Sequence, residues 1–137
     1  DLHDQKYLDM AEKIYNFIFN NPNLPEDLVP YWDFDAPNIP NEPRDVSAAA
    51  CTASALYELS TYIPGKNYKE TADKIMENLG SPAYRAEVGT NGNFILMHSV
   101  GSIPHGAEID VPLNYADYYF LEGIMRKRDL ESNKKLF

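Results

Sequence analysis

Two polar segments carry the residue types best suited to contacting a ligand. The first, residues 31–35, reads YWDFD, and the indole face of Trp32 suits stacking on the apolar face of a sugar ring. The carboxylates of this segment could accept hydrogen bonds from sugar hydroxyl groups. The structural alternative is that Trp32 and Phe34 close one end of a helical bundle, while Asp35 caps a turn or pairs with Arg44.

The second segment, residues 98–102, reads HSVGS. Its hydroxyl groups, on Ser99 and Ser102, lie three positions apart and could meet substrate oxygens, and His98 could donate a hydrogen bond to an anionic group. A purely structural role for these three side chains is left open. The segment is therefore a candidate binding loop rather than a catalytic motif.

Three other acidic residues are expected to be structural. Asp45 and Asp110 precede expected helices, where a carboxylate caps the exposed amide groups. Asp117 lies among tyrosines, which favours a buried, hydrogen-bonded carboxylate. The sequence contains no His/Cys/Asp cluster at metal-ligand spacing, no glycine-rich phosphate loop and no Ser-His-Asp arrangement. No catalytic residue, metal or cofactor is predicted.

Composition limits the possible partners. The chain has 137 residues and a net charge of -9, which argues against nucleic acid, because phosphate neutralisation requires a surplus of Lys and Arg. No run of about 18 apolar residues is present, so a membrane span is not expected. Cys51 cannot form an internal disulfide, and its alanine-rich surroundings predict a small buried thiol. The cellular compartment, cytoplasmic or periplasmic, is left open.

Hydrophobic periodicity predicts an all-α fold of antiparallel helical hairpins. The first and third helices are amphipathic and expected to be outer, whereas the second, small on nearly every face, and the fourth are expected to be inner. Gly80 is expected to stop the third helix in the left-handed conformation, and basic residues 126–128 to close the fourth. The expected helices span residues 4–20, 47–62, 68–79 and 113–127.

The connections between these helices alternate in length. A short turn joins the second helix to the third, whereas the other two connections are far longer than the usual few residues. Because successive packed helices run antiparallel, both long loops should emerge at the same end of the bundle. The two candidate binding segments lie in these two loops, so we expect one shared binding face.

Four sequence blocks resemble the C-terminal part of unsaturated glucuronyl hydrolases, glycoside hydrolase family 88. They cover nearly the whole chain in order, which is far more specific than one short motif. The blocks are PYWDFDAP at 30–37, PRDVSAAA at 43–50, NFILMHSVG at 93–101 and EIDVPLNYADYYFLE at 108–122.

This resemblance implies an (α/α)6 barrel, of which residues 1–137 would form the last third as a single helical segment. Members of the family remove an unsaturated uronic acid from the non-reducing end of oligosaccharides left by polysaccharide lyases. An Asp protonates the C4–C5 double bond and activates water, and this Asp lies in the earlier part of the family's chain. No position here matches it, so the chain alone is expected to be inactive and to need the missing N-terminal part of the barrel.

The resemblance also bears on substrate recognition by the second segment. In the family, a similar Ser-x-x-Ser-x-Lys loop contacts the sugar next to the cleaved bond, including sulfated sugars. Ser99 and Ser102 match this pattern, but Pro104 stands in place of the Lys. Sulfate recognition is therefore in doubt, with His105 as a candidate substitute. The expected substrate-binding residues are Trp32, His98, Ser99 and Ser102.

Two alternatives belong to other functional classes. A helical-repeat interaction module would also have small-residue helices, but its loops should be short. A stand-alone carbohydrate-binding domain would explain the tryptophan and serine loops without catalytic carboxylates. The expected partner is an unsaturated uronic-acid oligosaccharide, with the type of glycan and the oligomeric state left open.

Overall fold

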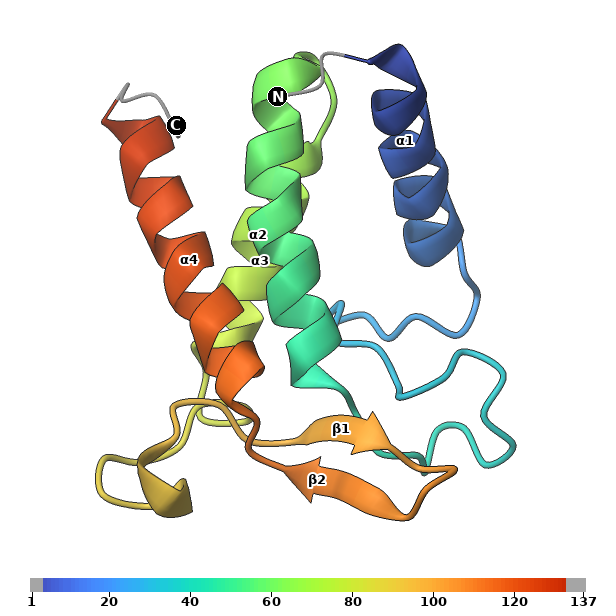
Figure 1. Ribbon diagram of the computed structural model, residues 1–137, viewed down its shortest axis with the longest axis vertical. Helices are drawn as coiled ribbons and strands as arrows, with labels where there is room; N and C mark the ends of the chain where they lie inside the picture. Colours follow the sequence, from blue (N-terminus) through green and yellow to red (C-terminus); the bar gives the residue numbers. More distant parts are fainter. Residues whose placement is uncertain (1–3, 133–137) are drawn as a thin grey trace.

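The structure is a computed structural model that describes residues 4–132 and contains four α-helices and one two-stranded antiparallel sheet (Figure 1). The four expected helices are confirmed, with ends that differ by a few residues at most. The elements, in chain order, are α1 (Gln5–Phe19), α2 (Val46–Tyr62), α3 (Tyr68–Leu79), the 3-10 turn η1 (Asn91–Asn93), β1 (Ser99–Ser102), β2 (Ala107–Val111) and α4 (Asn114–Glu131).

Side-chain caps explain where two of the helices begin. The carboxylate of Asp45 accepts a hydrogen bond from the backbone N–H of Ser47 (3.0 Å), which confirms the predicted cap of α2. Asp4 caps α1 in the same way. The prediction that Gly80 stops α3 in the left-handed conformation is wrong, because its φ is -75°. Pro82, two residues further on, cannot continue a helix and accounts for the end of α3.

The core lies around α2. Ala49, Ala50 and Ala53 of α2 are at most 1% exposed, and their small size lets α3 and α4 approach closely. α3 contributes Leu79 and α4 contributes Ala116, both fully buried. The prediction that α2 is an inner helix is therefore confirmed on the sides that face α3 and α4.

One carboxylate, that of Asp73 on α3, ties the three helices of the core together. The hydroxyl group of Tyr57 on α2 donates to its Oδ1 at 2.8 Å. Lys69 of α3 lies 2.7 Å away and Lys127 of α4 lies 2.9 Å away. Burial alone would raise the pKa of Asp73, but the hydrogen bonds from the two lysines and from Tyr57 together lower it.

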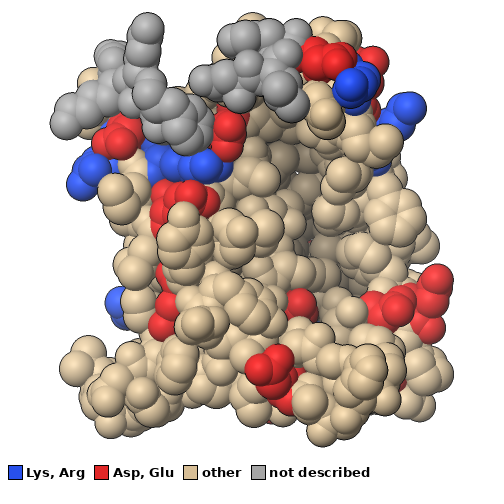
Figure 2. Space-filling model, in the orientation of Figure 1, with Lys and Arg blue, Asp and Glu red and all other residues tan. Residues whose placement is uncertain are grey.

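The helix α1 is the least covered of the four. It has no buried residue, and the side chains of Ile14 and Phe17 are 53% and 66% exposed. Tyr15 is one of the α1 residues that pack on the core, and its ring meets that of Tyr68 edge-on at 4.8 Å between centroids. An apolar groove of about 390 Å³ separates α1 from α2 and hollows this face of the molecule (Figure 2).

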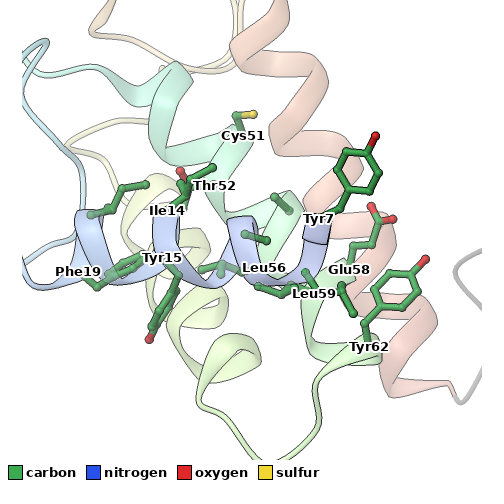
Figure 3. A pocket seen from close by; sticks show the side chains of 14 residues that line it. Tyr7, Ile14, Tyr15, Phe19, Cys51, Thr52, Leu56, Glu58, Leu59 and Tyr62 are labelled. Carbon is green, nitrogen blue, oxygen red and sulfur yellow. The ribbon is translucent and has the colours of Figure 1, made fainter. Parts of the chain in front are cut away.

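The prediction that Cys51 is buried is wrong. Cys51 is exposed on α2 and, with Thr52 and Ala55, forms part of the wall of the groove that faces α1 (Figure 3). Small residues do need close neighbours, but among the described residues only α3 and α4 supply them. Partial burial still raises the pKa of the Cys51 thiol, and the negative charge of Glu122 raises it further.

One face of α4 packs in the core while another is open. Phe120 packs in the core, whereas Tyr118, Leu121 and Met125 are 59%, 48% and 54% exposed. The prediction of an inner helix is thus met on one side only. Of the three basic residues expected to close α4, only Arg128 lies in its last turn.

The all-α prediction missed a β-hairpin. β1 and β2 pair antiparallel, with Ser99 opposite Val111, Val100 opposite Ile109 and a bulge between these pairs. The strands have only four and five residues and lack a buried alternating face, so their sequence carries no period-two signal. No described helix has the length and apolar character that crossing a membrane requires.

Candidate functional site

The two candidate segments meet at the N-terminal end of α2. The backbone N–H of Asp45 donates to the carbonyl of Pro30 (2.8 Å), and that of Val46 donates to the carbonyl of His98 (3.1 Å). The backbone N–H of Val100 also donates to Oδ1 of Asp45 (3.3 Å). In Figure 1 the hairpin and the loop after α1 lie together at the end where α2 and α4 begin. The prediction that both segments lie at one end of the bundle is confirmed.

The indole of Trp32 is half-buried and held at both its backbone and its ring nitrogen. The backbone N–H donates to the carbonyl of Pro43 (3.0 Å), and Nε1 donates to Oε2 of Glu42 (2.9 Å). This side-chain hydrogen bond is the main cause that lowers the pKa of Glu42. Trp32 also lines a cleft of about 180 Å³ together with Ala48 and Thr52 of α2. The ring is thus held beside a cleft.

The neighbours of Trp32 have structural contacts. Oδ1 of Asp33 accepts a hydrogen bond from the backbone N–H of Asp35 (2.8 Å), and both side chains are exposed. The ring of Phe34 meets that of Phe17 on α1 at 6.1 Å, which agrees with a role in closing the end of the bundle. The predicted pairing of Asp35 with Arg44 is wrong, since Arg44 pairs with a different carboxylate.

That carboxylate belongs to Asp27, which no sequence pattern indicates as a candidate. It forms an ion pair with Arg44 and accepts a hydrogen bond from the hydroxyl group of Tyr84 (2.6 Å). Nε of Arg44 donates to the carbonyl of Val29 (2.8 Å). Burial and the hydrogen bond to Asp27 raise the pKa of Tyr84. These contacts join the loop after α1 to the segment that leads into the hairpin.

Two side-chain pairs define the outer part of the hairpin. Nδ1 of His98 lies 2.6 Å from Oδ1 of Asp110, and Nδ1 of His105 lies 2.7 Å from the hydroxyl oxygen of Ser102. The prediction that Asp110 caps a helix is wrong, because Asp110 lies in β2, where it is the extra residue of the bulge. His98 and Asp110 are therefore partners across the hairpin.

Ser99 differs from Ser102 in its environment. Its side chain is 0% exposed, and its hydroxyl oxygen is the one buried side-chain polar atom without a hydrogen-bond partner in the part of the chain that the structure describes. Ser102 is half-buried and faces the turn of the hairpin. The two hydroxyl groups that the sequence places three positions apart are thus unequal in access to a ligand.

The remaining acidic candidates have structural partners. Asp117 of α4 accepts hydrogen bonds from the backbone N–H groups of Ile95 (2.8 Å) and Leu96 (2.9 Å), which confirms a hydrogen-bonded carboxylate. Its side chain is half-buried. Asp45 lies near Tyr115, whose pKa is raised first by burial and then by the charge of Asp45. Both carboxylates thus accept hydrogen bonds from backbone N–H groups.

The charge around the site is negative. Figure 2 shows acidic residues near the hairpin end, whereas most Lys and Arg on this face gather at the opposite end. In the described part of the chain, no group of three or more His, Cys, Asp or Glu side chains could hold a metal ion.

Sequence comparison relates the chain to enzymes that act on unsaturated uronides. No family model matches it. It is 48% identical over 128 residues to the unsaturated glucuronyl hydrolase of Formosa agariphila, across 93% of this chain and 32% of that protein. It is 28% identical over 130 residues to the unsaturated chondroitin disaccharide hydrolase of Streptococcus agalactiae, across 91% of this chain and 32% of that protein.

Structural comparison agrees. The TM-score is 0.92, with 47% identity, to an unsaturated glucuronyl hydrolase specific for heparin, across 96% of this chain and 36% of that one. The TM-score to the unsaturated glucuronyl hydrolase of Bacillus sp. GL1 is 0.82, with 25% identity. This match covers 91% of this chain and 34% of that one. These relatives are α/α toroids, so the predicted fold class is confirmed.

In each of these comparisons the match covers nearly all of this chain but only about a third of the relative. The chain therefore belongs to the unsaturated glucuronyl hydrolase family, of whose members it spans about one third.

Proposed function

We propose that this chain is the substrate-recognition part of a longer glycoside hydrolase. That enzyme removes unsaturated uronic acid from the non-reducing end of lyase-generated oligosaccharides by hydrating the C4–C5 double bond. The observation that supports this proposal most directly is the meeting of the Trp32 loop and the hairpin at the start of α2, within a chain 48% identical to an unsaturated glucuronyl hydrolase. A structure of a Streptococcus agalactiae relative in complex with an unsaturated disaccharide supports the substrate class.

In this proposal Trp32, His98, Ser99 and Ser102 contact the sugar. Trp32 supplies an apolar face beside a cleft, and its ring nitrogen is already occupied by Glu42, which leaves stacking as its contribution. Ser102 is accessible from solvent. Ser99 can take part only if the hairpin shifts, because its hydroxyl group is covered; its missing partner is then supplied by the ligand.

We assign the proton donor to the remainder of the enzyme. The carboxylates of Asp45 and Asp117 are engaged as backbone hydrogen-bond acceptors, and that of Asp110 is paired with His98. An acid that protonates a carbon-carbon double bond must be free to approach the sugar ring. Each of these three carboxylates already has a hydrogen-bond partner, which supports an acid contributed from outside this chain.

The remainder of the barrel would pack on the apolar surfaces that this chain leaves open. The groove between α1 and α2 is lined by apolar and small side chains, among them Ile14, Cys51 and Ala55, which would permit close approach of another helix (Figure 3). The exposed Leu121 and Met125 of α4 form a second such surface. These uncovered apolar surfaces disfavour a stand-alone binding domain.

Loss of the ultraviolet absorbance of an unsaturated disaccharide tests the proposal, because hydration destroys the chromophore. The full-length protein should consume the substrate, and residues 1–137 alone should not. If the isolated chain turns over at the rate of the full-length protein, the acid lies within this chain. If the full-length protein leaves the disaccharide intact, the proposed activity is wrong.

A further inference from the structure

Three non-glycine residues of the hairpin region have left-handed backbone conformations. The φ angles are 68° for His98, 53° for Glu108 and 53° for Asp110. This conformation costs an L-residue about 1–2 kcal/mol. Such residues cluster at active sites and ligand-binding sites, where the surrounding structure maintains the strained backbone. Asp110 is also the bulged residue of β2, and bulges re-aim side chains.

Three contacts hold His98, one at its backbone and two at its imidazole ring. The backbone carbonyl of His98 accepts from the N–H of Val46 at the start of α2 (3.1 Å). The ring lies edge-on to that of Tyr84, with 6.4 Å between centroids, and Tyr84 is itself fixed by its hydrogen bond to Asp27. The third contact is the 2.6 Å approach of Nδ1 to the carboxylate of Asp110.

The Asp110 contact determines which nitrogen of the ring carries the proton. A carboxylate can only accept a hydrogen bond, so Nδ1 of His98 must donate. In the neutral imidazole the other nitrogen, Nε2, then has a lone pair and accepts. No described residue is hydrogen-bonded to Nε2, and the side chain of His98 is 42% exposed. The hairpin thus presents an oriented, open hydrogen-bond acceptor.

The charge of the hairpin favours a hydroxyl group over an anion as the partner of Nε2. Residues 98–113 contain no Lys or Arg, whereas Glu108 and Asp110 are acidic. Asp45 faces the hairpin from α2, and Tyr115 faces it from α4. A negatively charged substituent would therefore meet several carboxylates without a basic partner, while a sugar hydroxyl group can donate to Nε2.

We propose that Asp110 is a positioning residue, which fixes the imidazole of His98 so that Nε2 accepts a hydrogen bond from a hydroxyl group of the substrate. This inference rests on the proposed function, since it concerns the same sugar site. It reverses the direction expected from the sequence, in which His98 donates to an anionic group.

Steady-state kinetics of the full-length protein with an unsulfated unsaturated disaccharide test this inference. Asp110→Asn replaces a group that can only accept with an amide that can either accept from or donate to Nδ1, so the ring proton is no longer confined to Nδ1, while Asn tolerates a left-handed backbone. We expect KM to rise about threefold to tenfold, the value of one lost hydrogen bond, with little change in kcat. His98→Ala should raise KM by a similar factor. Glu87→Gln, which removes an exposed charge outside the hairpin, is the control.

The double variant His98→Ala/Asp110→Asn separates positioning from a direct contact. If Asp110 acts only through His98, the double variant has the KM of His98→Ala. Multiplicative effects, or an unchanged KM in Asp110→Asn, overturn the inference while leaving the proposed function intact. A wild-type protein without turnover overturns the proposed function itself, so the two failures are distinguishable.

Discussion

The helical core and the hairpin differ in whether their buried polar groups have hydrogen-bond partners. In the core, the single carboxylate of Asp73 serves partners from three helices. In the hairpin, Ser99 has a buried hydroxyl group without a partner, and Asp110 adopts a left-handed backbone to reach His98. The polar groups of the core thus have partners within the chain, whereas the hairpin contains a buried hydroxyl group that has none.

The largest expected effect is the difference in the free energy of unfolding between truncating a buried leucine and truncating an exposed one. Leu79 of α3 is fully buried, and Leu79→Ala should lower the free energy of unfolding by about 2–5 kcal/mol through lost burial and a cavity. Leu121 of α4 is 48% exposed, so Leu121→Ala should cost far less in the isolated chain. Denaturant unfolding of residues 1–137 measures both.

The same pair tests the proposed packing of the remainder of the barrel on α4. In the full-length protein the cost of Leu121→Ala should rise toward that of Leu79→Ala, because the residue becomes buried. An equal, small cost of Leu121→Ala in both proteins would argue that nothing covers this face.

The next effect concerns the close contact of the two strands at Gly101. A Cβ atom at Gly101 would lie 2.0 Å from Oε2 and 2.8 Å from Cβ of Glu108. Gly101→Ala should therefore destabilise the hairpin by about 1–3 kcal/mol, while the helical core remains intact. Hydrogen exchange of the Val100 amide should become faster, with no change in the amides of α2.

A second substitution should reverse this effect. Glu108→Gly removes the clashing side chain and suits the φ of 53° at that position. The double variant Gly101→Ala/Glu108→Gly should recover the slow exchange of the Val100 amide. Continued fast exchange would show that Gly101 is needed for a reason other than its contact with Glu108.

This contrast also explains what the sequence could predict. The helices have apolar residues at helical spacing, and Asp45 stands directly before α2, so local signals suffice for the helices and for the cap. The shared end of the two loops followed from the antiparallel connections alone. The hairpin has no such signal, because its strands are short and β2 contains two left-handed non-glycine residues, Glu108 and Asp110.

The side-chain pairs of the candidate site could not be predicted from the sequence for a related reason. His98 and Asp110 are 12 positions apart and meet only because of the bulge in β2. Asp27 and Tyr84 are 57 positions apart and meet through tertiary packing. The prediction that Cys51 is buried fails because α2, although rich in alanine, is closely packed only on the sides that face α3 and α4.

A smaller effect concerns the pH dependence of the core. Because the folded-state pKa of Asp73 is lowered, its stabilising contribution is present above the ordinary value of about 3.9 and is lost as the pH falls through the folded-state value. Asp73→Asn should cost about 1 kcal/mol at neutral pH and should remove this part of the acid dependence. The free energy of unfolding of the wild type and of Asp73→Asn is measured between neutral and acidic pH. If both free energies change equally with pH, this role for Asp73 is excluded.

The smallest effect leaves the fold unchanged and reports on the groove. Cys51 is exposed in this chain, but its pKa is raised, so less thiolate is present at neutral pH and alkylation should be slower than that of free cysteine, with the rate increasing toward alkaline pH. In the full-length protein a helix in the groove would cover the thiol and slow the reaction further. Equal alkylation rates for the isolated chain and the full-length protein at the same pH would show that the groove remains open, and that the remainder of the enzyme packs elsewhere.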